Sequence, residues 1–264
     1  MSENNIGRHH RNFGSRQIYL PKKYNDLSAD YNKHDKNGNN DTNKFRFKNS
    51  LIITPNYEAE FESTGGIKYI KNHDDCVFFS GGGISAQTNG VKKLPVMQKR
   101  GVNKLSGQKK LIIEEKYNYE EKYEIHQNII LYYEENRVDF QVSFVKNTQL
   151  ETKDITSEFA LDFNFPEMYG DIFEYKEFAK KDEIKQTLEK LDKGLSGIEY
   201  IYLECRKGQE YGMTIYPERK QTIEYKTSTG YNKNKSLIFS VANPPELDKN
   251  YINLKFYLEK YKVV

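Results

Sequence analysis

Strict alternation of apolar and polar positions marks two stretches in the middle of the chain. Residues 138–144 read V-D-F-Q-V-S-F, and residues 159–165 read F-A-L-D-F-N-F. Successive side chains of an extended strand point to opposite faces, so each stretch places its large apolar residues on one face. The pattern predicts strands that are half buried against a core.

Similar runs recur along the chain and predict about a dozen strands with no repeated motif. A Gly-Gly pair at residues 65–66 separates two of them and predicts a hairpin. The sequence therefore predicts an all-β fold, a large antiparallel β-sandwich or supersandwich. Beyond the two central stretches, the clearest runs are 45–48, 51–53, 57–61, 67–70, 77–79, 111–113, 117–125, 198–203, 211–216, 222–225, 237–241 and 252–258.

Two segments depart from the strand pattern. Residues 80–108 hold six glycines and few apolar anchors, which predicts either a long loop or short strands with mobile connections. In 182–193, Ile184, Leu188 and Leu191 follow a helical spacing, with Asp182 suited to the N-cap and Gly194 to the C′ position. We expect one short helix there.

The chain divides by composition near residue 44. Residues 1–50 carry ten Lys or Arg against five Asp or Glu, a net of +5, while the whole chain has a net charge of +3. Residues 1–44 show no sustained period and predict a basic, polar, disordered arm with a short strand over 17–20. No linker interrupts residues 45–264, so we expect a single β-sandwich domain there.

Aromatic residues supply much of the core. Only 36% of the residues are hydrophobic, but 21 Tyr and 15 Phe are among them, and each aromatic side chain buries roughly 150–250 Å². The small net charge does not predict a nucleic-acid partner. No apolar run is long enough to span a membrane and no secretory signal opens the chain, which predicts a soluble, cytoplasmic protein. Cys76 and Cys205 are expected to be buried thiols or one disulfide bridge.

Two segments resemble the galactose-mutarotase-like supersandwich of aldose epimerases, glycoside hydrolases and polysaccharide lyases. Residues 56–70, N-Y-E-A-E-F-E-S-T-G-G-I-K-Y-I, look like its opening hairpin, and residues 129–140, I-I-L-Y-Y-E-E-N-R-V-D-F, look like its long central hairpin. The resemblance covers roughly residues 50–260 and implies a supersandwich fold in a carbohydrate setting. No segment matches the His acid and Glu base of the epimerases, and no separate catalytic domain precedes the sandwich. The resemblance therefore identifies no catalytic residue in this chain.

Two histidines are candidates for acid–base chemistry. His73 stands beside Asp74 and Asp75, where it could act with a carboxylate or bind a cation, although a solvated turn explains the same residues. His126 is in the middle of a strand and points away from the face of Ile125. If the His126 face is concave and solvated it forms a site, and if it packs on the second sheet it is core. We expect core.

Tyrosines and oxygen ligands supply the remaining candidates. Arg137 and the tyrosines of 117–123 are candidates for sugar binding on a polar sheet face. Residues 35–41 place oxygen ligands as a Ca²⁺ loop does, but Gly38 is at position 4 and Arg46 takes the position of the closing Glu, so a flexible turn explains them better. The tyrosines are Tyr117, Tyr119 and Tyr123, and the oxygen ligands are Asp35, Asn37, Asn39 and Asp41.

The sequence leaves three functions open. The first is a non-catalytic carbohydrate-binding or accessory sandwich protein that uses a polar, tyrosine-rich sheet face. The second is a carbohydrate-active enzyme on the same fold, an epimerase, lyase or hydrolase, which requires histidines and carboxylates to converge in one groove. The third is a structural or interaction protein that uses the basic arm. No cofactor is predicted, and the oligomeric state and the identity of the sugar stay open.

Overall fold

The described part of the chain consists of strands, turns and bends, without a helix. The computed structural model describes residues 11–12, 15–19, 45–73, 77–105, 109–121, 123–146, 157–165, 169–177, 181–187, 196–205, 212–217, 222–227, 235–242 and 250–259. Its strands form two antiparallel sheets, sheet A with 11 strands and sheet B with 10. The predicted all-β sandwich is confirmed.

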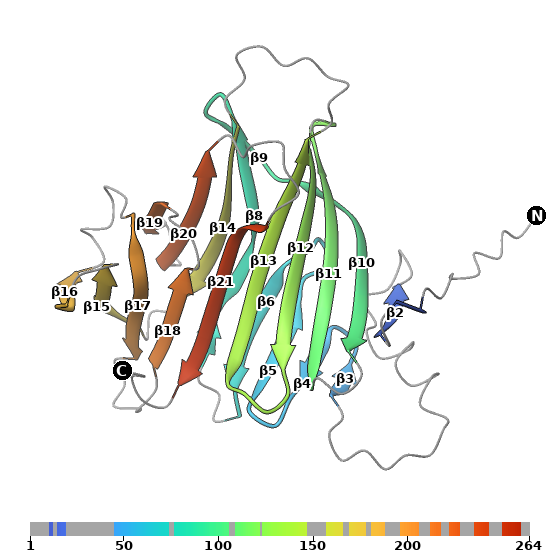
Figure 1. Cartoon of the computed structure of the whole chain (residues 1–264), viewed down its shortest axis with the longest axis horizontal. Helices are drawn as coiled ribbons and strands as arrows, with labels where there is room; N and C mark the ends of the chain where they lie inside the picture. Colours follow the sequence, from blue (N-terminus) through green and yellow to red (C-terminus); the bar gives the residue numbers. More distant parts are fainter. Residues whose placement is uncertain are drawn as a thin grey trace, which may run out of the picture.

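The long strands of sheet A stand side by side in front of the first strands of sheet B (Figure 1). In spatial order, sheet A comprises β1 (Arg11–Asn12), β2 (Ser15–Tyr19), β10 (Val96–Leu105), β11 (Lys110–Tyr119), β12 (Tyr123–Tyr132), β13 (Arg137–Lys146), β21 (Asn250–Glu259), β18 (Gly212–Pro217), β17 (Ile198–Cys205), β15 (Tyr169–Glu177) and β16 (Ile184–Thr187). Sheet B comprises β19 (Thr222–Thr227), β20 (Lys235–Ala242), β14 (Ser157–Phe165), β8 (Gly81–Thr88), β6 (Ile67–Asn72), β5 (Tyr57–Phe61), β4 (Leu51–Ile53) and β3 (Arg46–Lys48), with β7 (Val77–Phe79) beside β6 and β9 (Val91–Lys93) beside β8.

Four phenylalanines join the sheets at the centre of the sandwich. Phe140 of β13 and Phe256 of β21 come from sheet A, while Phe79 of β7 and Phe163 of β14 come from sheet B. The ring centroids lie 4.8 Å apart for Phe79 and Phe256, and 4.8 Å apart for Phe140 and Phe163. Such aromatic pairs add about 0.5–1.5 kcal/mol each beyond the area they bury. The alternating runs seen in the sequence thus become the two inner faces.

A buried carboxylate joins the sheets near the β5–β6 turn. Glu115 of β11 accepts hydrogen bonds from Arg100 Nε at 2.7 Å and from Gln127 Nε2 at 3.2 Å. The hydroxyl of Tyr117 donates to the same carboxylate, as does the backbone N–H of Gly66 on sheet B at 3.0 Å. The side chains of Arg100 and Glu115 are only 2% and 0% exposed. Burying this pair of charges is tolerable because donors surround the carboxylate.

The two glycines of the turn are required by this arrangement. Gly65 and Gly66 have φ angles of 109° and 78°, a region that residues with a side chain rarely adopt. A Cβ on Gly66 would lie 2.3 Å from the carbonyl oxygen of Gly82, and one on Gly65 would collide with the Tyr117 hydroxyl. The turn therefore approaches sheet A closely enough for its N–H to reach Glu115.

The helix prediction is wrong where the structure describes it. Ile184–Thr187 form strand β16, which pairs with β15, and Ile184 packs partly against the core. The backbone is satisfied by pairing with the sheet edge, and this tertiary context overrides a weak local preference for helix. Leu188, Leu191 and Gly194 lie outside the described residues.

The glycine-rich stretch forms strands rather than a long loop. Strands β8, β9 and β10 all lie within residues 80–108. A Cβ on Gly82 would lie 2.8 Å from Cδ1 of Phe163 on the neighbouring strand β14. Glycine at position 82 therefore allows the close approach of the Phe163 ring.

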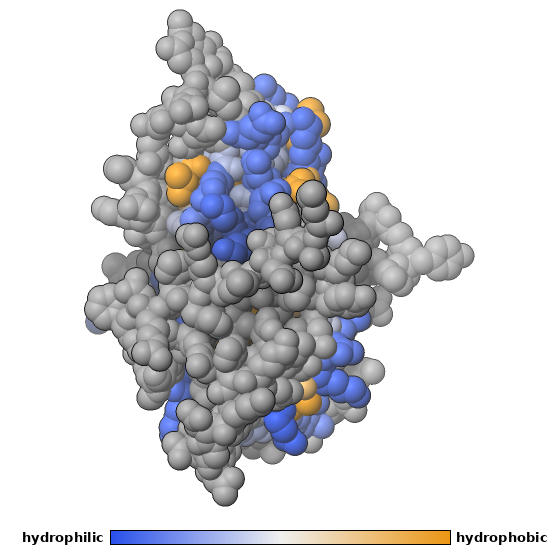
Figure 2. All heavy atoms as spheres, turned by 90° about the vertical axis from the view of Figure 1, so that its right-hand side faces the viewer, coloured by the Kyte–Doolittle hydropathy of each residue, from blue (hydrophilic) through white to orange (hydrophobic). Residues whose placement is uncertain are grey.

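The start of the chain adds two strands, β1 and β2, to one edge of sheet A. Strand β2 pairs with β10, in the region where the sequence predicts a short strand over 17–20. Figure 2 shows the side of the molecule that is at the right of Figure 1, where the described surface is mostly hydrophilic and apolar residues form small separate spots. Within the described ranges, no helix has the length and apolarity needed to cross a membrane.

The substitution Glu115→Gln tests the importance of the buried carboxylate. It would leave the buried Arg100 guanidinium without its counter-charge, so we expect the free energy of unfolding to fall by about 3–5 kcal/mol. The control is Glu124→Gln, which removes a carboxylate paired with Lys116 at 41% exposure and should change stability by no more than roughly 0.5 kcal/mol. Urea denaturation measures both, and equal effects would contradict the prediction.

Candidate functional site

The outer face of sheet A carries a row of tyrosines around one arginine. We call this the tyrosine face and define it by Tyr132, Arg137, Tyr257, Tyr216 and Tyr200, from the adjacent strands β12, β13, β21, β18 and β17. The residues that alternate with them point inward and form the core. Arg137 is directly opposite Tyr257 in the strand register. The strand order therefore brings together side chains that are far apart in the sequence.

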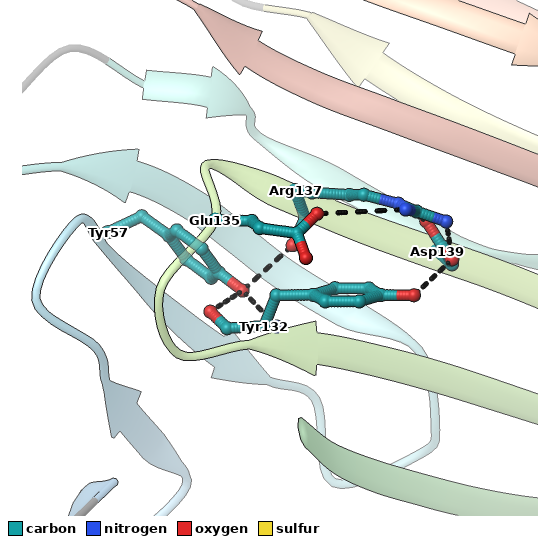
Figure 3. A network of polar contacts seen from close by, with 5 residues as sticks. All are labelled: Tyr57, Tyr132, Glu135, Arg137 and Asp139. Atoms are coloured by element: carbon teal, nitrogen blue, oxygen red, sulfur yellow. Dashed lines mark hydrogen bonds and ion pairs between the residues drawn. The ribbon is translucent and has the colours of Figure 1, made fainter. Parts of the chain in front are cut away.

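Arg137 is held by a fork-like pair of hydrogen bonds. Its Nε donates to Asp139 Oδ1 at 2.7 Å and its Nη2 to Asp139 Oδ2 at 2.6 Å (Figure 3). The hydroxyl of Tyr132 donates to the same Oδ2 at 2.7 Å. Two parallel bonds fix the plane of the guanidinium and are stronger than neutral hydrogen bonds. The arginine is thus pre-positioned without a ligand.

Two aromatic rings flank the guanidinium. Its central carbon lies 4.6 Å from the ring centroid of Tyr132 and 5.3 Å from that of Tyr257. The ammonium of Lys110 lies 5.0 Å from the Tyr132 ring. Cation–π attraction stabilises such arrangements, more so where they are desolvated. Arg137 keeps 18% of its side chain exposed, whereas Asp139 keeps 4%.

Burial and hydrogen bonding shift the pKa values of Arg137 and Tyr132. Burial works to lower the pKa of Arg137, but the hydrogen bonds and the charge of Asp139 outweigh burial and raise the pKa. Burial raises the pKa of Tyr132, and the hydrogen bond to Asp139 raises it further. Arg137 therefore stays charged and Tyr132 stays neutral at physiological pH, which suits binding and positioning rather than proton transfer.

Tyrosine rings continue the surface away from the arginine. The centroids of Tyr216 and Tyr257 lie 5.5 Å apart at an interplanar angle of 82°, and those of Tyr200 and Tyr216 lie 5.8 Å apart. Tyr216 and Tyr257 are partly exposed, while Tyr200 is buried and donates a hydrogen bond to Glu183. An edge-to-face contact between Tyr216 and Tyr257 and a tilted contact between Tyr200 and Tyr216 fix the rings, so Tyr216 and Tyr257 present apolar surface to solvent beside a fixed donor.

Tyr57 of sheet B fixes the hairpin that bears Arg137. Its hydroxyl accepts a hydrogen bond from the backbone N–H of Tyr132 at 2.9 Å and lies 3.1 and 3.0 Å from the carbonyl oxygens of Tyr132 and Arg137 (Figure 3). Burial raises the pKa of Tyr57. One hydroxyl therefore satisfies both ends of the β12–β13 turn from the opposite sheet.

His126 is on the solvent side of sheet A, so the expectation that it lies in the core is wrong. Its side chain is 45% exposed and its Nε2 lies 2.5 Å from Glu124 Oε1. Burial of Glu124 works to raise its pKa, but hydrogen bonds from Lys116 and His126 outweigh this and lower the pKa. The face of Tyr117 is the buried one. The sequence separates the two faces correctly and assigns them to solvent and core in reverse.

His73 is at the end of β6 on sheet B. Its Nε2 lies 2.9 Å from the carbonyl oxygen of Thr54, and its Nδ1 lies 3.9 Å from Glu58 Oε1. His73 contacts Thr54 and Glu58, whereas His126 contacts Glu124 on the outer face of sheet A, so the two histidines share no contact. Asp74 and Asp75 lie outside the described residues.

The other predicted site residues divide between core and undescribed segments. Tyr117 and Tyr119 are 4% and 1% exposed in the core, and Tyr123 packs partly against it, so these rings do not form an open platform. Arg137 alone of the predicted binding residues is in the tyrosine face. Among the described residues no group of three or more His, Cys, Asp or Glu could hold a metal ion. The oxygen ligands Asp35, Asn37, Asn39 and Asp41 lie outside that set.

Tyr216, Tyr257 and Asp139 were not predicted as site residues. The spacing of Arg137 and Asp139, two apart on one strand, puts both on one face and could have indicated the charged pair. The tyrosines carry no such local signal, since their proximity depends on β21 pairing with β13 and β18.

Comparison with known proteins finds a likeness in structure alone. No family model matches the sequence, and no curated protein matches it either. The fold is similar to three solved structures at TM-scores of 0.50–0.51. The α-galactosidase AgaA of Geobacillus stearothermophilus, of family GH36, is 8% identical (TM-score 0.50, 80% of this chain and 39% of its own). The α-N-acetylgalactosaminidase NagBb of Bifidobacterium bifidum is 7% identical in its Gal-NHAc-DNJ complex (TM-score 0.51, 79% and 36%). The α-galactosidase of Lactobacillus brevis is 7% identical (TM-score 0.50, 79% and 39%).

These similarities show the fold. The predicted resemblance to the sandwich domains of glycoside hydrolases is confirmed at that level. The chain spans less than two fifths of the length of each of the three enzymes. The same sandwich can carry different functions, so the arrangement of side chains has to support any further step.

The substitution Tyr57→Phe tests how Tyr57 positions the hairpin. It leaves the buried N–H of Tyr132 without its acceptor, so we expect the free energy of unfolding to fall by about 1–3 kcal/mol at pH 7.

The same variant should also change the response to alkali. Folding raises the pKa of Tyr57 above the ordinary value of 10.0. The contribution of neutral Tyr57 to the free energy of unfolding is therefore complete below pH 10 and is lost as the pH rises above it. Urea unfolding from pH 7 to pH 11 should show stability falling above pH 10, less steeply in Tyr57→Phe by up to about 1.4 kcal/mol per pH unit. Identical slopes would refute this account.

Proposed function

We propose that the protein is a non-catalytic carbohydrate-binding sandwich protein, and that the tyrosine face is its binding surface. The observation that supports this most is the fixed guanidinium of Arg137 beside the partly exposed rings of Tyr257 and Tyr216. A sugar ring has one apolar C–H face and a rim of hydroxyl groups. It would stack on a tyrosine while its hydroxyls accept hydrogen bonds from the arginine.

The geometry favours binding over catalysis. The enzyme hypothesis requires a histidine and a carboxylate to converge in one groove. His126 meets Glu124 where the two side chains are 45% and 41% exposed, and His73 Nδ1 lies 3.9 Å from Glu58 Oε1, beyond hydrogen-bond distance. The carboxylate beside the tyrosine face, that of Asp139, already accepts hydrogen bonds from Arg137 and Tyr132. The interaction hypothesis rests on the side chains of residues 1–44, which lie outside the described set, and nothing favours it here.

The structural neighbours suggest which sugar to try first. Two are named α-galactosidases and one an α-N-acetylgalactosaminidase. We therefore propose that the ligand is an oligosaccharide with α-linked galactose or N-acetylgalactosamine at its end. Several rings along the row of strands would suit an extended ligand of more than one sugar unit.

The substitution Tyr216→Ala tests the proposed surface. We expect calorimetric titration of the full chain with α-galactosyl oligosaccharides to show binding that weakens by about tenfold in the variant, which equals roughly 1.4 kcal/mol. Tyr69→Ala is the matched control, because Tyr69 is also a partly exposed tyrosine but lies on the outer face of sheet B. Its affinity should equal that of the unmodified chain. Absence of binding at millimolar sugar, or equal losses in both variants, would refute the proposal.

A further inference from the structure

A second surface feature is on the opposite side of the sandwich. The outer face of sheet B contains a cavity of about 90 Å³, lined among others by Ser85, Gln87, Lys92, Ala160 and Asp162. These residues come from strands β8, β9 and β14. The tyrosine face is on the outside of sheet A, so the two features share no residue.

Small side chains create the floor of this cavity. Ala160 is directly opposite Ser85 on β8, and both of these small residues line the cavity. On the other side of Ala160 the neighbouring residue on β20 is Ser240, which is also small. On β14 the next outward residues on either side are Glu158 and Asp162, whose longer side chains rise above the floor. A small side chain between two longer ones along β14 leaves a hollow in the face of the sheet.

The polar groups of the hollow are incompletely satisfied. Asp162 Oδ2 lies 3.4 Å from the ammonium of Lys92, but its Oδ1 is buried and accepts no hydrogen bond in the described part of the structure. The amide of Gln87 donates to Glu158 and so fixes the second carboxylate. Because Oδ1 is buried, the oxygen that a ligand can reach is Oδ2, whose contact with Lys92 is as long as 3.4 Å and which can accept a further hydrogen bond.

The combination of groups limits the class of ligand. Two carboxylates against one ammonium disfavour an anion such as a phosphate. A divalent cation is also disfavoured, because it takes six or more oxygen ligands and the hollow offers only two carboxylates beside the positive charge of Lys92. What fits is a neutral group with hydroxyls that both donate and accept, and with a C–H face for Ala160 and Ile238.

We infer that this hollow is a second binding site, which takes a single hydroxyl-rich ring of monosaccharide size. A ring hydroxyl donates to Asp162 Oδ2, another accepts from Lys92 Nζ, and the C–H face of the ring covers Ala160. The site differs in kind from the tyrosine face, which presents open rings to a longer ligand. The inference stands independently of the function proposed for that face.

The substitution Asp162→Asn tests the inference while preserving the shape of the hollow. Titration of the full chain with galactose, N-acetylgalactosamine, glucose and mannose, followed by ligand-observed NMR, should show millimolar binding of at least one of them. We expect the variant to weaken this binding by about tenfold or more, because a charged acceptor is lost.

Glu60→Gln is a closely matched control. Glu60 is a carboxylate on the same face of sheet B, 3.0 Å from Lys68 and 22% exposed, compared with 24% for Asp162. This control and Tyr216→Ala should leave monosaccharide binding unchanged. If no monosaccharide binds, or if Asp162→Asn binds as well as the unmodified chain, the inference is wrong. If Tyr216→Ala loses oligosaccharide binding while Asp162→Asn leaves monosaccharide binding unchanged, this site is refuted and the proposed function stands. If Asp162→Asn loses monosaccharide binding while Tyr216→Ala leaves oligosaccharide binding unchanged, this site stands and the proposed function is refuted.

Discussion

The arrangement of the sheets depends most on the hydrogen bonds that the carboxylate of Glu115 accepts. This carboxylate lies in the interior of the sandwich and is satisfied by Arg100, Tyr117 and Gln127 of sheet A together with the N–H of Gly66 of sheet B. A buried charge tolerates little displacement, because every lost hydrogen bond leaves a desolvated group behind. Apolar contacts between the sheets would permit small shifts, whereas this contact specifies one position of the β5–β6 turn.

Tyr57 imposes the same kind of constraint at the other end of the β5 strand. Its hydroxyl fixes the main chain at Tyr132 and Arg137, the two residues on either side of the β12–β13 turn. The position of the Arg137 guanidinium on the outer face is therefore set from the inside of the molecule. A single polar atom from sheet B thus supports the surface of sheet A to which we assign the function.

Both proposed sites are on outer faces because the interior is filled. The phenylalanines of the core are in direct contact across the sheets, and the inward tyrosines Tyr117 and Tyr119 are buried among them. Outward positions do not contribute to the contact between the sheets, so they can carry rings on sheet A and a hollow on sheet B. One scaffold can in this way present two chemically different surfaces in opposite directions.

The sequence by itself determined the secondary structure class, the main hairpins and the separation of each strand into two faces, because a period of two is a local property of an extended chain. It separated His126 from Tyr117 correctly. Only the tertiary structure decided which face is buried, since that depends on where the second sheet lies. It also turned the start of the predicted helix, at Ile184, into a paired strand, and it decided between the loop and the short strands that the glycine-rich segment left open. The tyrosine face could not be predicted for the same reason: Arg137, Tyr257 and Tyr216 become neighbours through the strand order β13-β21-β18, and such pairings between distant segments leave no periodic trace in the sequence.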